Sequence, residues 1–191
     1  MIFASRREKR LWFAAGLCTL LIYSSLYIAR PAAELLRERN LLRLAVALSF
    51  LAAGSLVAWR LFAIRAGWRA LVTAGVIGAG YLALLTAIPM MPEERLHFLE
   101  YGVVAALIYL ALCERRARLV ETGIDVGDRV ARLQPFATAV VSTGIIGWLD
   151  EGIQAILPNR VYDVRDVTFN AVAALISVAS VKLMEWARQR E

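Results

Sequence analysis

Two short segments contain the residue types and spacings that suit chemistry. In the first, residues 92–102, His97 and Tyr101 stand four residues apart, so a helix places them on one face. Glu94 and Glu100 lie three residues to either side of His97. An imidazole exchanges protons near neutral pH, and a neighbouring carboxylate can orient it. The segment therefore predicts a histidine–acid pair that serves acid–base catalysis or polar recognition.

The second segment, residues 148–170, is rich in acids and amides. Asp150 and Glu151 are adjacent, and Gln154 follows one turn later in a helix. Further along, the segment includes the polar residues Arg160, Asp163, Arg165, Asp166 and Asn170. Two adjacent carboxylates near lipid repel each other and lose hydration, which favours a functional role for Asp150 and Glu151. Arg160 can hold an anionic group by paired hydrogen bonds.

Structural interpretations of the same residues stay open. His97 alone suits a hydrogen bond across helices. Asp163 and Asp166 suit caps at the start of a helix, where free amides and the positive end of the dipole meet them. Arg160 and Arg165 suit interfacial anchors or salt bridges.

The elements that carry these residues are predicted to be membrane-spanning helices. Hydrophobic residues make up 60% of the 191-residue chain, above the roughly 45–50% of soluble domains. Apolar runs, each near the roughly 20 residues that cross a bilayer, cover 11–29, 41–59, 70–88, 97–113, 135–156 and 166–184. Helices satisfy their own backbone hydrogen bonds in lipid. We therefore expect an all-α, polytopic transmembrane bundle of about six spans, forming a single domain over residues 1–191.

Proline positions indicate where these helices end. Prolines fall at or beside the predicted boundaries, where a missing amide costs least, at Pro31, Pro89, Pro92, Pro135 and Pro158. Between the first two runs, residues 32–43 suit a short amphipathic helix lying in the membrane interface.

The basic residues predict the orientation of the chain. With the N-terminus inside, the inner segments carry 15 of the 22 lysines and arginines, and the outer loops carry the rest. This bias predicts a multi-pass membrane protein with both termini in the cytoplasm. Because the same bias accounts for the net charge of +6, no nucleic-acid partner is expected.

Three predicted helices bring polar groups to a similar depth near the outer face. An ionisable residue inside a span costs at least about 2.5 kcal/mol, so such residues usually face the bundle interior and have partners. We therefore expect one outward-facing pocket formed by His97, Asp150, Glu151, Gln154, Arg160, Asp166 and Asn170. Glu100, Tyr101 and Asp163 are further predicted ligand-binding residues.

These segments resemble a known family. The run Glu94-Arg95-Leu96-His97-Phe98-Leu99-Glu100-Tyr101-Gly102, the element Asp150-Glu151-Gly152-Ile153-Gln154 and the stretch from Leu157 to Asn170 are similar to the VanZ-like family of bacterial membrane proteins. The resemblance covers about residues 86–180, and it implies a location in the bacterial cell envelope, in the inner (cytoplasmic) membrane. Residues 1–85 would then be an N-terminal helical extension to this VanZ-like core. The family is named for a protein that contributes to low-level resistance to the glycopeptide teicoplanin.

The chain departs from the family pattern at three places. Glu93-Glu94-Arg95 stands where an acid–lysine pair often precedes the histidine. Residues 41–88 look like an insertion of two spans, and Asn159 replaces a frequent glycine.

Two functions remain open. The first is a membrane protein that binds an envelope glycan, glycopeptide or lipid-linked ligand through the polar pocket. The alternative is an enzyme acting on a lipid-linked or cell-wall precursor, with His97 as general acid or base and Asp150 or Glu151 orienting it. No Ser-x-x-Lys, His-Glu-x-x-His or glycine-rich phosphate motif supports the enzyme. Proton or ion coupling is less favoured, because nothing ionisable continues the path inward.

Partners and cofactors follow from these functions. Membrane lipid and a lipid-linked or cell-wall precursor are the expected partners. We expect no cofactor and no metal, although His97, Glu100, Asp150 and Glu151 include the ligand types of a metal site.

Overall fold

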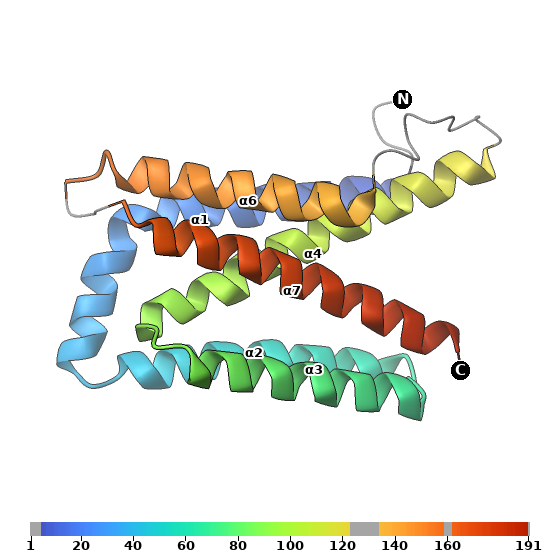
Figure 1. Ribbon diagram of the computed structural model, residues 1–191, viewed down its shortest axis with the longest axis horizontal. Helices are drawn as coiled ribbons and strands as arrows, with labels where there is room; N and C mark the ends of the chain where they lie inside the picture. The colour runs from blue at the N-terminus through green and yellow to red at the C-terminus, as the bar shows by residue number, and fades with distance from the viewer. Residues whose placement is uncertain (1–4, 123–133, 159–161, 191) are drawn as a thin grey trace. The chain divides into compact units, whose positions relative to one another are not determined.

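A computed structural model of the chain describes residues 5–122, 134–158 and 162–190. All regular secondary structure in these ranges is α-helical, which confirms the all-α prediction. The helices are α1 (Arg6–Glu38), α2 (Leu42–Ala63), α3 (Trp68–Ala87), α4 (Pro92–Glu121), α6 (Pro135–Gln154) and α7 (Val164–Gln189) (Figure 1). Each contains one of the predicted apolar runs, apart from overhangs of one or two residues in the second, third and fifth runs.

Within the described residues, five helices are long and apolar enough to cross a membrane, namely α1, α2, α3, α4 and α7. Large apolar side chains on these helices are exposed, among them Phe13 at 71% and Phe62 at 84%. Such surfaces suit contact with lipid rather than water. Helix α6 is not among these five helices. It has 20 residues, and the acids Asp150 and Glu151 lie in its last turns. A sixth span therefore stays a prediction.

The prolines mark most of the boundaries as predicted. Pro92 and Pro135 begin α4 and α6, and Pro89 follows the end of α3. At the start of α4, the Glu94 carboxylate accepts a hydrogen bond from the Met91 amide at 2.9 Å. This is half of a capping box, and it gives Glu94 a structural role at the helix start.

The boundary predicted at Pro31 is wrong, because α1 continues through it to Glu38. Proline removes one backbone hydrogen bond, but the following residues Ala32–Glu38 are mostly strong helix formers. The predicted interfacial helix at residues 32–43 is therefore not a separate element. The chain turns instead at Asn40, whose φ of 55° lies in the left-handed region that asparagine tolerates.

The chain divides into two compact units. Unit 1 contains residues 1–30 and 97–178, and unit 2 contains residues 31–96 and 179–191. Unit 2 includes both α2 and α3, the helices expected as an insertion. In unit 2, α2 packs against α3, and Arg69 donates a hydrogen bond to the Arg190 carbonyl. The single domain over residues 1–191 stays a prediction.

Unit 1 holds all the described site residues that the sequence predicts. Its helices are tied together by hydrogen bonds and ring contacts. The Ser177 hydroxyl donates to the Gly102 carbonyl at 2.6 Å, joining α7 to α4. Figure 1 shows α6 running alongside α1, and the Tyr23 hydroxyl joins them by donating to the Ile146 carbonyl at 2.7 Å.

A cluster of charged side chains lies where the start of α1 meets the end of α4. Glu8 is fully buried, and its Oε1 lies 3.3 Å from the Trp12 indole nitrogen and 3.8 Å from Arg115 Nε. Beside it, Glu114 accepts from the Ser5 hydroxyl at 2.8 Å and pairs with Arg7 at 3.2 Å. These charges are compensated within the protein, so we assign this group a structural role.

Candidate functional site

The last turns of α6 bury two adjacent carboxylates. Asp150 and Glu151 are both fully buried, and Gln154 is 3% exposed. The Gln154 amide nitrogen donates to Glu151 Oε1 at 2.7 Å and lies 3.4 Å from Asp150 Oδ2. One amide therefore lies between the two acids and offsets part of their repulsion.

Glu151 also ties the start of α7 to the end of α6. Its Oε2 accepts a hydrogen bond from the Asp163 backbone amide at 3.1 Å. Asp163 in turn accepts from the Arg165 amide at 2.8 Å, which is the N-terminal capping geometry that its sequence position suggested. Both oxygens of Glu151 thus have protein donors, which indicates that Glu151 shapes the site.

Asp150 faces groups from three other positions. Tyr23 of α1 and Glu100 and Tyr101 of α4 each lie close enough to Asp150 for electrostatic interaction. Tyr101 is fully buried. Tyr23 lies far from Asp150 along the chain, so no sequence spacing indicates this proximity. Asp150 is therefore the residue that connects α1, α4 and α6.

His97 and Glu100 form a pair at the start of the α4 segment in unit 1. His97 Nδ1 lies 3.7 Å from Glu100 Oε2, and the His97 and Tyr101 rings have centroids 6.0 Å apart. Because Glu100 also interacts with Asp150, His97 is linked to the α6 acids through Glu100. The shared pocket of His97 and Asp150 stays a prediction.

Asn170 enters the site from α7. It is fully buried, and its amide oxygen and nitrogen have no hydrogen-bond partner in the described part of the chain. Its side chain packs on Gly147, since a Cβ at Gly147 would lie 2.6 Å from Asn170 Cβ. A buried amide without partners costs about 1–3 kcal/mol per group. Asn170 therefore has hydrogen-bonding capacity that the described residues leave unused.

Thr143 is a site neighbour that sequence reasoning missed. It is fully buried, and its hydroxyl lacks a hydrogen-bond partner within the described residues. The missed signal is a stripe along α6 at helical spacing, consisting of Thr143, Gly147, Asp150, Glu151 and Gln154. Small and polar residues on that stripe face the interior of unit 1.

We call the set Tyr23, His97, Glu100, Tyr101, Asp150, Glu151, Gln154, Asp163, Asp166 and Asn170 the polar cluster. Acids dominate it, since Asp166 also lies within electrostatic range of Glu151. Arg165 stacks over the Phe169 ring with its guanidinium carbon 5.7 Å from the centroid. Arg160 lies outside the described residues.

Among the described residues, no group of three His, Cys, Asp or Glu side chains is arranged to hold a metal ion. Cys18 and Cys113 are not joined by a disulfide bond.

In comparisons with known proteins, no family model, curated protein or solved structure matched this chain. The similarity to the VanZ-like family therefore stays a prediction from the motifs.

Proposed function

We propose that this chain is a VanZ-like membrane protein of the bacterial cell envelope that binds the headgroup of a lipid-linked glycan or glycopeptide. The observation that carries the proposal is the polar cluster, to which α1, α4, α6 and α7 all contribute. Its buried members are Tyr101, Asp150, Glu151, Gln154 and Asn170. Burial of polar groups away from water is costly unless hydrogen bonds compensate. A ligand that supplies those bonds would recover this cost.

The chemistry of the cluster favours a ligand rich in hydrogen-bond donors. Carboxylates accept hydrogen bonds and repel anions, and the cluster has five of them, at Glu100, Asp150, Glu151, Asp163 and Asp166. Asn170 adds an amide that both donates and accepts. Sugar hydroxyls and amino groups match this set, whereas a bare phosphate does not.

The binding proposal predicts that Asp150→Asn weakens glycan binding by about tenfold or more, the effect of losing roughly 1.4 kcal/mol. The purified protein would be melted in detergent with and without a polyprenyl-linked disaccharide pentapeptide. Wild-type protein is expected to melt at a higher temperature with ligand, and Asp150→Asn is expected to lose that shift.

Glu121→Gln is a matched control, because Glu121 is an exposed acid at the end of α4 and pairs with Arg118. It should keep the ligand shift. If Asp150→Asn melts at the wild-type temperature and shows the full shift, the proposal is wrong. A fall in ligand-free melting would instead assign Asp150 a structural role.

We also propose that the protein lies in the inner membrane with both termini in the cytoplasm. The support is the concentration of lysine and arginine in the predicted inner segments. This orientation places the polar cluster near the outer leaflet, where lipid-linked envelope precursors present their headgroups.

Cysteine labelling in intact cells tests this orientation. In a Cys18→Ala, Cys113→Ala background, Pro158→Cys is expected to react with a membrane-impermeant maleimide, and Thr122→Cys only after lysis. Both positions are exposed and lie near helix ends. External labelling of Thr122→Cys would reverse the orientation and remove the outer-leaflet part of the proposal.

A second candidate function, an enzyme acting on the same class of ligand, is favoured by the His97–Glu100 pair. A histidine beside a carboxylate is a common general acid or base, and the 3.7 Å separation allows the carboxylate to orient the ring. His97→Gln should then abolish turnover of the lipid-linked ligand while the ligand-induced melting shift persists. Loss of both in parallel would favour a binding role for His97.

A further inference from the structure

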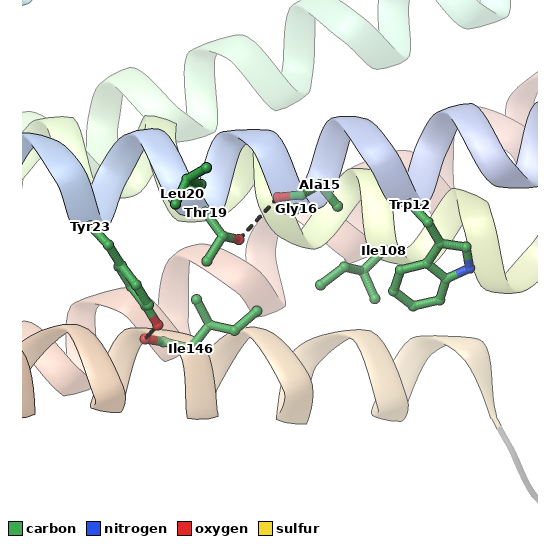
Figure 2. Close-up of a pocket in the computed structure, with 8 residues that line it drawn as sticks. All are labelled: Trp12, Ala15, Gly16, Thr19, Leu20, Tyr23, Ile108 and Ile146. Atoms are coloured by element: carbon green, nitrogen blue, oxygen red, sulfur yellow. Dashed lines mark hydrogen bonds between the residues drawn. The ribbon is translucent and has the colours of Figure 1, made fainter.

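An apolar groove of about 420 Å³ runs along α1 in unit 1, and Gly16 is among its lining residues. Figure 2 shows this lining, to which α1, α4 and α6 all contribute. Its hydroxyl groups are hydrogen-bonded within the protein, since Thr19 donates to the Ala15 carbonyl and Tyr23 to the Ile146 carbonyl. The groove therefore matches hydrocarbon in general and selects no particular ligand. A charged surface in unit 2 is more selective.

The turn between α2 and α3 in unit 2 carries arginines without acids. Arg60, Arg65 and Arg69 are all exposed. The sequence has no aspartate or glutamate over residues 39–92, which include both helices. The hairpin therefore brings three positive charges to one end and has no carboxylate of its own to neutralise them.

The end of α7 adds positive charge at the same place. Arg69 donates a hydrogen bond to the Arg190 carbonyl, and Figure 1 shows the C-terminal end of α7 beside the α2–α3 turn. Arg188 and Arg190 are exposed, and Glu185 is the one acid in residues 179–190. We call Arg60, Arg65, Arg69, Arg188 and Arg190 the basic patch.

Aromatic rings accompany these arginines. Large aromatic side chains near the turn are exposed, namely Trp59, Phe62 and Trp68. The Arg69 guanidinium carbon lies 5.6 Å from the centroid of the Trp68 ring, and that of Arg190 lies 4.4 Å from the Trp186 ring. Because tryptophan prefers the headgroup level of a membrane, these rings place the arginines at the depth of lipid phosphates.

Arg65 has a backbone conformation that glycine ordinarily adopts. Its φ is 49°. The Ala66 amide donates to the Leu61 carbonyl at 2.9 Å, and the Arg65 amide donates to the Phe62 carbonyl at 3.0 Å. This is the Schellman motif that ends many helices, usually with glycine in the left-handed position. A residue with a Cβ is disfavoured there, which indicates that the Arg65 side chain is retained for its charge.

We propose that the basic patch binds the headgroup of an anionic phospholipid such as phosphatidylglycerol. A guanidinium matches phosphate oxygens by paired hydrogen bonds. Leu56 and Val72, each about one turn from the patch, are exposed apolar side chains that suit contact with acyl chains, which favours a lipid over a soluble phosphate. In the orientation proposed above, the patch faces the inner leaflet. The inference is independent of glycan binding, whose residues lie in unit 1.

Native mass spectrometry of the full chain, released from an uncharged detergent, tests this inference. Phosphatidylglycerol and phosphatidylcholine with identical acyl chains would be titrated separately, and an apparent Kd obtained for each. Wild-type protein is expected to bind phosphatidylglycerol more tightly. Arg65→Gly should weaken phosphatidylglycerol binding by about fivefold, the effect of losing the roughly 1 kcal/mol that one basic residue contributes. Its phosphatidylcholine binding should not change.

Melting without added lipid separates charge from backbone strain. Arg65→Gly relieves the left-handed conformation, so its melting temperature should stay level or rise. Asn40→Gly is the matched control, because Asn40 ends α1 in the same motif with a φ of 55° and carries no charge. It should melt in the same way and keep the wild-type affinity for phosphatidylglycerol. Should Arg65→Gly melt lower, Arg60→Gln removes a charge from the patch outside the turn and should give a similar loss of affinity.

Three outcomes would overturn the inference. One is equal affinity of the wild-type protein for the two lipids, and another is wild-type phosphatidylglycerol affinity in both Arg65→Gly and Arg60→Gln. The third is an equal loss in Arg116→Gln, which removes an exposed charge at the end of α4 in unit 1, because it would show general attraction to basic helix ends. Inorganic phosphate should not displace the lipid more than chloride does at equal ionic strength; if it does, the occupant is a soluble anion and the inference is wrong.

Discussion

Replacing Gly147 by alanine is expected to destabilise unit 1 by about 1–3 kcal/mol, the usual cost of overpacking. The new Cβ would lie 2.6 Å from Asn170 Cβ and 2.9 Å from its amide nitrogen. Because the Asn170 Cβ is fixed to the α7 backbone, a rotamer change cannot relieve the first contact, and α6 and α7 must separate. Thermal unfolding in detergent would measure the loss, with a shift of roughly 2–4 °C for each kcal/mol at this chain length.

The control is Gly144→Ala in the same helix. Its Cβ would meet nothing within 4 Å, and alanine favours a helix over glycine by about 1 kcal/mol, so its melting temperature should stay level or rise. Asn170→Gly removes the opposing Cβ, and the double variant with Gly147→Ala should be more stable than the sum of the single losses predicts. Wild-type melting of Gly147→Ala would show that α6 and α7 do not pack this closely.

Glu151→Ala is expected to cause the second large loss of stability. It removes the acceptor for the Gln154 side chain at 2.7 Å and for the Asp163 amide at 3.1 Å. The Asp163 amide loses the acceptor that the Glu151 side chain provides, and a buried donor without a partner costs about 1–3 kcal/mol. Gln154 keeps only its longer hydrogen bond to Asp150 Oδ2 at 3.4 Å. Amide hydrogen exchange at Asp163 should become faster, because the link between the end of α6 and the start of α7 is lost.

Glu151→Gln distinguishes hydrogen bonding from charge. Its amide oxygen can still accept from Asp163, and the change removes the repulsion between Glu151 and the nearby acids Asp150, Asp163 and Asp166. It should therefore melt closer to wild type than Glu151→Ala does. If Glu151→Ala is as stable as wild type, relief of repulsion outweighs the two hydrogen bonds, and the structural role assigned to Glu151 is incorrect.

Local patterns predicted the helices well, because the bilayer imposes a simple rule. A span must satisfy its own backbone and present apolar side chains, so runs of apolar residues indicate helices directly. Pro92 and Pro135 lie in the first turn of α4 and α6, where a missing backbone amide is tolerated. Pro31 did not, since the helix formers after it extend α1 despite the lost hydrogen bond.

The sequence alone predicts that His97 and Tyr101 share a helix face, since helical geometry is the same wherever the helix packs. It also shows directly that Asp150 and Glu151 are adjacent. Their division into roles depends on contacts between helices. The Asp163 amide gives Glu151 a structural role, and Tyr23 brings α1 to Asp150. No period along the chain encodes these long-range contacts.

The groove and the close approach of Gly147 to Asn170 were decided only by the tertiary structure. A glycine in the sequence indicates that backbone can come close or that space is left open, but it does not distinguish the two. The space beside Gly147 is occupied by the Asn170 side chain, whereas a Cβ at Gly16 would meet no atom within 4 Å. Which outcome a glycine produces depends on the side chain that the facing helix places opposite it, because packing is a property of pairs of surfaces rather than of one segment.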